Sequence, residues 1–190
     1  RWALDEDAAS EVEFQNVDTD VREDGTYESV IETQVKVLKE SARTELATQL
    51  FNYNSNVSEF KVLAARTLVD GKSISVESSK IEDKPRASSQ QGFDQLNQVM
   101  VAFPEVKIGA SVYTKIRIKV KEAAFPGFFS ADYSYGIPVR EKSGRVRIRS
   151  EVPLAIERND PSHVLRIEEV KKGSSHEISI VLTEPAYRMP

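Results

Sequence analysis

Cysteine is missing from this chain of 190 residues, and several kinds of chemistry are excluded with it. Without a thiol there is no disulfide, no thiolate metal site and no cysteine nucleophile. Only two histidines are present, too few for a zinc site built from three histidines. The sequence also lacks a glycine-rich phosphate loop, a dinucleotide fingerprint and a Gly-x-Ser-x-Gly nucleophile motif. We therefore expect a non-enzymatic domain with no metal and no cofactor of its own.

Long apolar runs and a strong excess of one charge are missing as well. No stretch approaches the roughly 20 apolar residues that a membrane helix needs, so no membrane span is predicted. The formal net charge of -4 gives no indication of nucleic acid binding. The 39% of hydrophobic residues and 29% of charged residues are instead typical of a globular domain with a core.

Alternation of apolar and polar residues is the main pattern in the chain. It is clearest over residues 111–121, and the dipeptides Asp24-Gly25, Asp70-Gly71 and Lys172-Gly173 are strong hairpin turn signals. Short runs of this kind recur at hairpin spacing, the last few including residues 154–158, with helical periodicity only over 41–50. The sequence predicts an all-β fold, an antiparallel β-sandwich of about ten to eleven strands with one short helix, and a polar loop over 82–95.

No internal repeat or domain boundary interrupts this pattern, so residues 1–190 are predicted to form a single domain. The chain starts with Arg1-Trp2 and ends at Pro190, and both ends are interpreted as cut points in a longer protein. Because Pro185 and Pro190 oppose strand pairing, residues 184–190 are predicted to be a semi-rigid exit linker.

Aromatic residues gather between residues 124 and 136, and two interpretations of them stay open. The cluster could be an exposed contact surface, since rigid rings provide contact area at little entropic cost, or a loop that closes one end of the core. Tyrosines have polar tips, so Tyr133 and Tyr135 are expected to be more exposed than the phenylalanines. The candidate interaction surface consists of Phe128, Phe129, Tyr133 and Tyr135.

Basic residues share one face of two predicted strands. If these strands were neighbours, seven cations would line one surface and could meet an acidic partner. The alternative is a solvated outer face on which Glu28, Glu32 and Glu168 form cross-strand pairs with them. The candidate basic face consists of Lys115, Arg117, Lys119, Lys121, Arg145, Arg147 and Arg149.

Three segments in a fixed order connect the chain with a known family. They are Val62–Lys72 with its Asp-Gly turn, Val101–Val106 with the sequence Val-Ala-Phe-Pro-Glu-Val, and the Val112-Tyr113-Thr114-Lys115 strand after Gly109. This order resembles the bacterial domain of unknown function that precedes transglutaminase-like domains in exported or membrane-attached proteins. The resemblance covers roughly residues 12–183 and implies a β-sandwich, export to the periplasm or cell envelope, and a catalytic neighbour on the C-terminal side.

The resemblance makes an accessory or interaction domain the expected function. Such a domain would dock on a transglutaminase-like or protease-like neighbour, or present a glycan or peptide substrate to it. A carbohydrate-binding module of the periplasm or cell surface is the alternative. A further arrangement considered from the sequence is a metal site formed by the two histidines, His163 and His176.

Overall fold

The structure is a computed structural model that describes residue 6 and residues 8–86, 96–136 and 139–187. These residues form twelve strands and one α-helix, which confirms the predicted, mostly β, two-sheet fold. The bounds are β1 (Ser10–Val21), β2 (Tyr27–Val37), α1 (Glu40–Ala47), β3 (Thr48–Asn54), β4 (Ser58–Val69), β5 (Lys72–Ser75), the 3-10 helix η2 (Ser78–Lys80), β6 (Ile81–Pro85), β7 (Leu96–Ala102), β8 (Ser111–Val120), β9 (Arg140–Glu141), β10 (Gly144–Ser150), β11 (Leu165–Lys172) and β12 (Ser175–Leu182).

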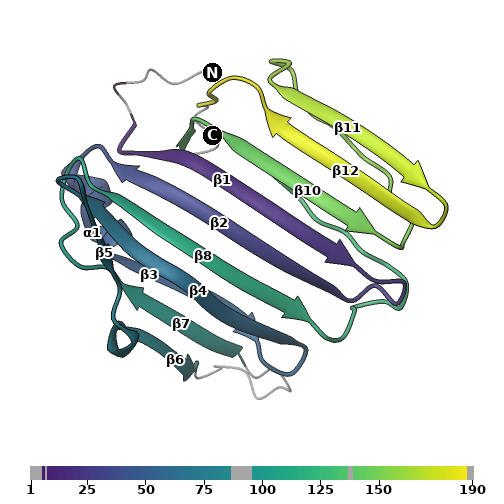
Figure 1. Cartoon of the computed structure of the whole chain (residues 1–190), viewed down its shortest axis with the longest axis horizontal. Coiled ribbons are helices and arrows are strands. Elements are labelled where there is room, and N and C mark those ends of the chain that lie inside the picture. The colour runs from purple at the N-terminus through teal and green to yellow at the C-terminus, as the bar shows by residue number, and fades with distance from the viewer. Residues whose placement is uncertain (1–5, 7, 87–95, 137–138, 188–190) are drawn as a thin grey trace.

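A large, twisted sheet is the main body of the molecule (Figure 1). Its strand order is β11-β12-β10-β1-β2-β8-β4-β5, with the short β9 pairing beside β1. A second sheet of order β3-β7-β6 covers part of it. The pairing is antiparallel as predicted except at β1, which runs parallel to both β10 and β9. Alternation along a strand does not encode the direction of its partner, so the sequence pattern could not reveal this.

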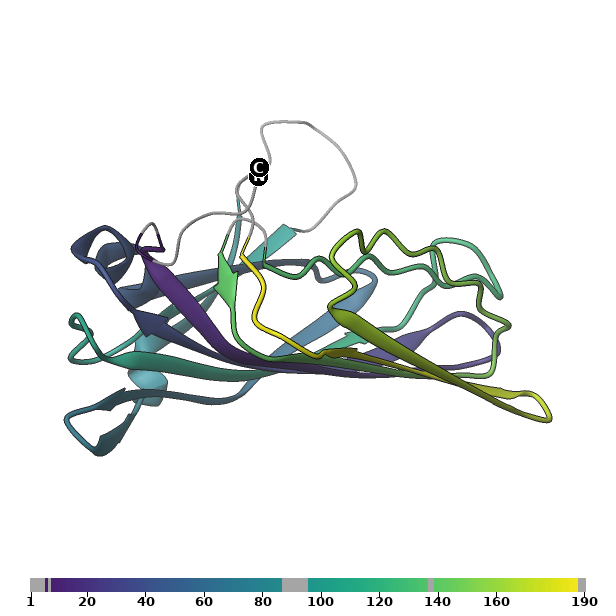
Figure 2. The ribbon, with the colours of Figure 1, turned by 90° about the horizontal axis from the view of Figure 1, so that it is seen from above.

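The second sheet and two long loops lie on the same side of the large sheet (Figure 2). Strand β2 shows this directly, because its odd-numbered residues all point to one face. Tyr27 and Ile31 pack into one hydrophobic cluster and Val35 belongs to another. We call this side of the large sheet the inner face and the opposite side the outer face.

Two different coverings divide the inner face into halves. Under the β3-β7-β6 sheet lies a cluster formed by Val35, Ala65, Val99, Val101, Phe103 and Val112. Over β1, β10 and β12 the covering consists of residues 121–136 and 151–164, and the cluster is formed by Val17, Val21, Val146, Ile148, Val152 and Ile178. We call them the sheet-covered half and the loop-covered half.

Three short segments differ from their predicted structure. The predicted helix over 41–50 ends at Ala47, and the asparagine-rich segment after it forms the second part of β3. Residues 82–85, predicted to be loop, belong to β6, which pairs with β7. Residues 154–158, predicted to be a strand, are irregular and cross over the inner face without pairing with a described strand. Most of the predicted loop over 82–95 lies outside the described residues.

Candidate functional site

The aromatic segment separates into exposed and packed rings. Phe125 and Phe128 are 69% and 56% exposed, and their rings meet edge to face with centroids 6.4 Å apart. Phe129 packs edge to face on Tyr27 with a centroid distance of 5.1 Å, and Tyr133 and Tyr135 are half-buried against the loop-covered cluster. The expectation that the tyrosines would be the exposed members is therefore wrong. Phe129, Tyr133 and Tyr135 alternate along an extended segment and point at the sheet.

A contact between two loops holds the exposed pair in place. Gly25, in the β1–β2 turn, has a positive φ of 85°, and a Cβ there would lie 2.7 Å from the carbonyl oxygen of Phe128. Gly127 donates a hydrogen bond to the carbonyl oxygen of Asp24 at 2.9 Å. In the same turn, hydrogen bonds from the Thr26 hydroxyl and backbone N–H keep the pKa of Asp24 below its usual range. Phe125 and Phe128 therefore project from a defined turn.

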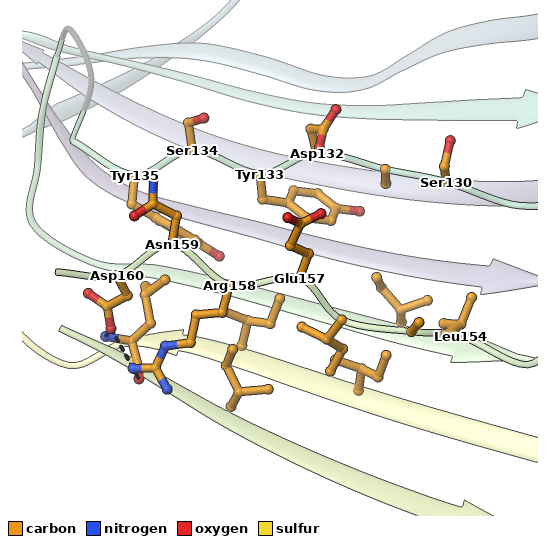
Figure 3. A pocket seen from close by; sticks show the side chains of 18 of the residues that line it. Ser130, Asp132, Tyr133, Ser134, Tyr135, Leu154, Glu157, Arg158, Asn159 and Asp160 are labelled. Atoms are coloured by element: carbon orange, nitrogen blue, oxygen red, sulfur yellow. Dashed lines mark hydrogen bonds and ion pairs between the residues drawn. The ribbon is translucent and has the colours of Figure 1, made fainter. Parts of the chain in front are cut away.

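A pocket of about 870 Å³ lies between the two loops and the inner face. This volume is within the range of small-molecule sites in proteins. Figure 3 shows Tyr133 and Tyr135 pointing into the space between the loops, whereas Ser130, Asp132 and Ser134 point away. The base of the pocket is apolar and includes Ile148, Leu154, Leu165, Ile167, Ile178 and Ile180. Sequence analysis missed this pocket, because the β-branched residues of β10 and β12 look like ordinary core.

Charged and polar contacts anchor the second loop. Asp160 accepts hydrogen bonds from the backbone N–H groups of Val164 and Leu165 at 3.1 and 3.0 Å, and from Arg158 Nη2 at 2.5 Å. These bonds hold the pKa of the Asp160 carboxyl below its usual range although burial acts in the opposite direction. Arg158 Nη2 also donates to the carbonyl oxygen of Leu165 at 2.9 Å. The pair thus joins the loop to the first residue of β11.

His176 is buried and fully engaged within the same half. Its Nδ1 accepts a hydrogen bond from Leu154 N at 3.2 Å, and its Nε2 lies 2.6 Å from Glu169 Oε1. His163 is exposed, with a positive φ of 55°. No cluster of three metal-ligating side chains exists in the described part of the chain. His176 has a structural position, whereas the His163 side chain is exposed, and sequence analysis could not tell a buried histidine from a solvated one.

A buried carboxyl lies at one end of the loop-covered half. Glu141 accepts a hydrogen bond from Gly136 N at 3.1 Å through Oε2, while its Oε1 and the hydroxyl of Tyr135 make no hydrogen bond to described residues. Burial raises the pKa of Glu141 to about 7. Burial and the neighbouring Glu141 carboxylate raise the pKa of Tyr135 as well. In the sequence, Glu141 comes two residues after the apolar Val139, so both side chains would point to the same face of a strand. This pattern indicates an inward-facing position and could have identified Glu141.

The same region holds the C-terminal segment. Glu141 and Ala186 exchange two backbone hydrogen bonds of 2.8 Å, and Ala186 and Tyr187 are 3% and 9% exposed. Ala186 and Tyr187 of the predicted exit linker therefore pack on the domain, whereas Glu184 and Pro185 are exposed and residues 188–190 lie outside the described part. A linker role for 184–190 stays a prediction.

The candidate basic face is divided in two by acidic strands. Its residues lie on the outer face, but β10 and β8 are not neighbours, since β1 and β2 run between them. Arg145 and Arg149 donate hydrogen bonds to Asp18 and Asp20 on β1, and Arg147 Nε lies 2.8 Å from Asp18 Oδ1 without the alignment of a hydrogen bond. Cross-strand pairing thus neutralises the β10 arginines, although their partners are aspartates of β1 and not the glutamates that sequence analysis considered.

The β8 cations have fewer partners. Lys115 faces Glu32 across the sheet, but Glu32 accepts the hydrogen bond of the Tyr113 hydroxyl at 2.5 Å. Lys121, just beyond β8, pairs with Glu59 at 3.6 Å. Lys115, Arg117 and Lys119 make no ion pair with the described residues. The structure therefore does not bring the seven predicted cations together into one patch.

None of the described helices has the length and apolar character needed to span a bilayer. No curated protein matches the chain. The chain is similar in structure to a "putative protease" from Parabacteroides distasonis, with a TM-score of 0.78 and 17% identity over 95% of this chain. It spans only 36% of that protein, so the similarity shows a shared fold over about a third of its length.

Two other similarities are weaker. An M1 zinc metallopeptidase from Deinococcus radiodurans gives a TM-score of 0.43 with 10% identity, over 93% of this chain and 40% of that one. The CBM3a-L domain with flanking linkers from scaffoldin cipA of the Clostridium thermocellum cellulosome gives 0.33 with 12% identity, over 67% and 79%. Residues 23–186 match the family described as "Domain of Unknown Function with solved-structure structure". Because this match covers most of the chain, the chain belongs to the DUF3857 family.

Proposed function

We propose that the chain is a non-catalytic accessory domain of a larger, exported protein, which docks on a transglutaminase-like or protease-like catalytic neighbour or presents substrate to it. The observation that carries the proposal is the exposed pair Phe125 and Phe128, fixed by the contact of Gly127 and Phe128 with the β1–β2 turn. Exposed apolar rings on a rigid turn are typical of a contact surface, because they bury area without a large loss of conformational entropy.

Two further observations support this proposal. The buried His176 is held by hydrogen bonds, and the described residues offer no group of metal ligands. The Parabacteroides protein with the same fold continues well beyond the part that this chain matches. An accessory role in a longer protein accounts for both. Location in the periplasm or cell envelope belongs to the same proposal.

The first test is genetic. The coding sequence downstream of Pro190 should encode a domain that carries a cysteine and a histidine in the arrangement of a transglutaminase-like enzyme. A stop codon directly after residue 190, or a downstream domain of a non-catalytic kind, would contradict the proposal.

The second test separates docking from folding. In the chain alone, Phe125→Ala with Phe128→Ala should change the free energy of unfolding by less than about 1 kcal/mol, whereas Phe129→Ala should cost about 3 kcal/mol as a packed ring is lost. In a protein that joins this chain to the catalytic domain, the double variant should lower the activity or the melting temperature of the catalytic domain. If the joined protein does not respond to the double variant, the aromatic pair is not a docking surface.

A further inference from the structure

The free edge of the large sheet borders the pocket. Strand β11 is the last strand on its side of the sheet, and no described strand pairs with its free edge (Figure 1). Its residues Leu165 and Ile167 line the pocket with their side chains. In a strand, one residue can therefore present its side chain to the pocket and its backbone to the open edge.

Hydrogen bonds at Leu165 show which backbone groups face that edge. Its N–H and carbonyl are bound by Asp160 Oδ2 and Arg158 Nη2, at 3.0 and 2.9 Å, on the side away from β12. Val164 O, in contrast, accepts a hydrogen bond from Thr183 N, the continuation of β12. Since the direction of backbone groups alternates along an antiparallel strand, Ile167, Glu169 and Lys171 face the open edge as Leu165 does.

Arg158 and Asp160 therefore occupy the first position of an additional strand. Together they satisfy both backbone groups of Leu165, as the main chain of a paired strand would. The outward-facing backbone groups of Ile167, Glu169 and Lys171 have no partner among the described residues. A peptide that added to this edge of β11 would continue the backbone hydrogen bonding that Arg158 and Asp160 begin at Leu165.

The charge at the mouth of the pocket favours one kind of occupant. Glu157 is exposed, points toward the Tyr133 ring and makes no ion pair with the described residues (Figure 3). Arg158 is paired with Asp160, so its positive charge is compensated. A basic residue of a ligand would meet an unpaired carboxylate here, whereas an acidic one would be repelled.

We propose that an extended peptide adds to β11 as a further strand and inserts a bulky apolar side chain into the pocket, with a basic residue beside it near Glu157. Strand addition of this kind obtains affinity from main-chain pairing and selectivity from side-chain pockets. Charged residues along β11, such as Glu168 and Lys172, oppose indiscriminate pairing at the edge, so the pocket is what selects the partner. This inference rests on the proposed function and names the class of substrate or partner as unfolded, basic and apolar peptide.

The experiment uses the chain of 190 residues and a fluorescein-labelled peptide of alternating leucine and lysine, followed by fluorescence anisotropy. Ala155→Trp fills the pocket from the exposed loop and should weaken binding about tenfold. Ala124→Trp adds the same ring to an exposed position outside the pocket and should leave affinity within about twofold. Circular dichroism confirms that both variants are folded. Equal affinity of the two variants would overturn the proposal.

Two peptide series test main-chain pairing and charge separately. In one peptide the odd-numbered backbone nitrogens are methylated, and in the other the even-numbered ones. One of these peptides should lose binding and the other should keep it, because only every second N–H of an added strand faces β11. Equal effects of the two methylation patterns would overturn strand addition. Glu157→Lys should weaken binding of the lysine peptide and strengthen that of a glutamate counterpart, while Glu122→Lys, on a residue that does not line the pocket, should change neither.

Competition identifies other occupants. An oligosaccharide or a fatty acid is added as a competitor. If either displaces the peptide and binds more tightly than every peptide tested, the pocket has another class of ligand and the proposal is wrong. Because these measurements need no catalytic neighbour, their failure leaves the docking role of Phe125 and Phe128 untouched. Loss of that docking role would equally leave peptide binding measurable.

Discussion

The two halves of the inner face are covered in different ways. In the sheet-covered half, β7 supplies Val99 and Val101, which are 3% and 0% exposed, so regular strands pack closely on this part of the large sheet. In the loop-covered half, irregular segments span the same kind of sheet surface and leave a pocket of about 870 Å³. Close packing gives the first half its stability, and incomplete packing gives the second half room for a ligand.

A pH-dependent stability should originate in the loop-covered half. The pKa of Glu141 is about 7 in the folded chain and 4.5 in an unfolded chain, so folding favours the protonated carboxyl. The contribution of Glu141 to the free energy of unfolding is fully present below pH 4.5. It falls by about 3 kcal/mol as the pH rises to 7 and changes little above that. Glu141→Gln removes the titrating group and should be more stable than the wild type at pH 8 but equal at pH 4.

Urea unfolding across this pH range measures the effect. A wild-type chain whose stability is unchanged between pH 4.5 and 7 would show that Glu141 is accessible to water. Glu184→Gln, at an exposed position, is the control and should follow the wild type.

The same valine-to-alanine substitution should cost a different free energy of unfolding in each half. Val101→Ala removes buried methyl groups from the sheet-covered half and should cost about 2 kcal/mol. Val164→Ala, at a half-buried position on the pocket, should cost less than about 1 kcal/mol, since the space beside it already exists. Chemical denaturation with unchanged m-values provides the comparison. Similar losses for both variants would mean that the pocket closes in solution.

Sequence patterns predicted the strands and their turns far better than their partners. Asp24-Gly25 and Asp70-Gly71 form the expected turns, because the positive φ values of Gly25, Asp70 and Gly71 are a local property of these residues. The division of the inner face could not be predicted in this way. Residues 81–85 gain strand structure by pairing with β7, whereas residues 154–158 pair with no described strand and remain irregular.

The candidate sites show the same limit. Phe128 and Phe129 are neighbours with the same side chain, yet Phe128 is exposed and Phe129 packs on Tyr27. Their different exposure depends on the contact between Gly25 and the loop. Glu141 owes its raised pKa to burial, and Asp160 accepts its hydrogen bonds because the loop folds back so that Val164 and Leu165 donate to it. Composition identified what the chain lacks, but these arrangements depend on tertiary structure.

The smallest effects are expected on the outer face of the large sheet. Arg147→Ala breaks a half-buried pair with Asp18 and should cost about 1 kcal/mol. Lys115→Ala, on the unpaired β8 side, should stay within about 0.5 kcal/mol. Added salt should reduce the cost for Arg147 and leave Lys115 unchanged. A cost for Lys115 as large as that for Arg147 would show that the β8 cations also have structural partners.

The parallel pairing of β1 with β10 also bears on the order in which the protein is assembled. Arg145 and Asp18 are bonded across 127 positions of sequence, so β1 must wait for most of the chain before its second edge is covered. During synthesis the β1–β2 hairpin and the sheet-covered half can form first, while contacts of such long range are slow to close. A chain that ends before Gly144 would leave β1 as a bare edge, and we expect such a fragment to aggregate where the full chain stays dispersed.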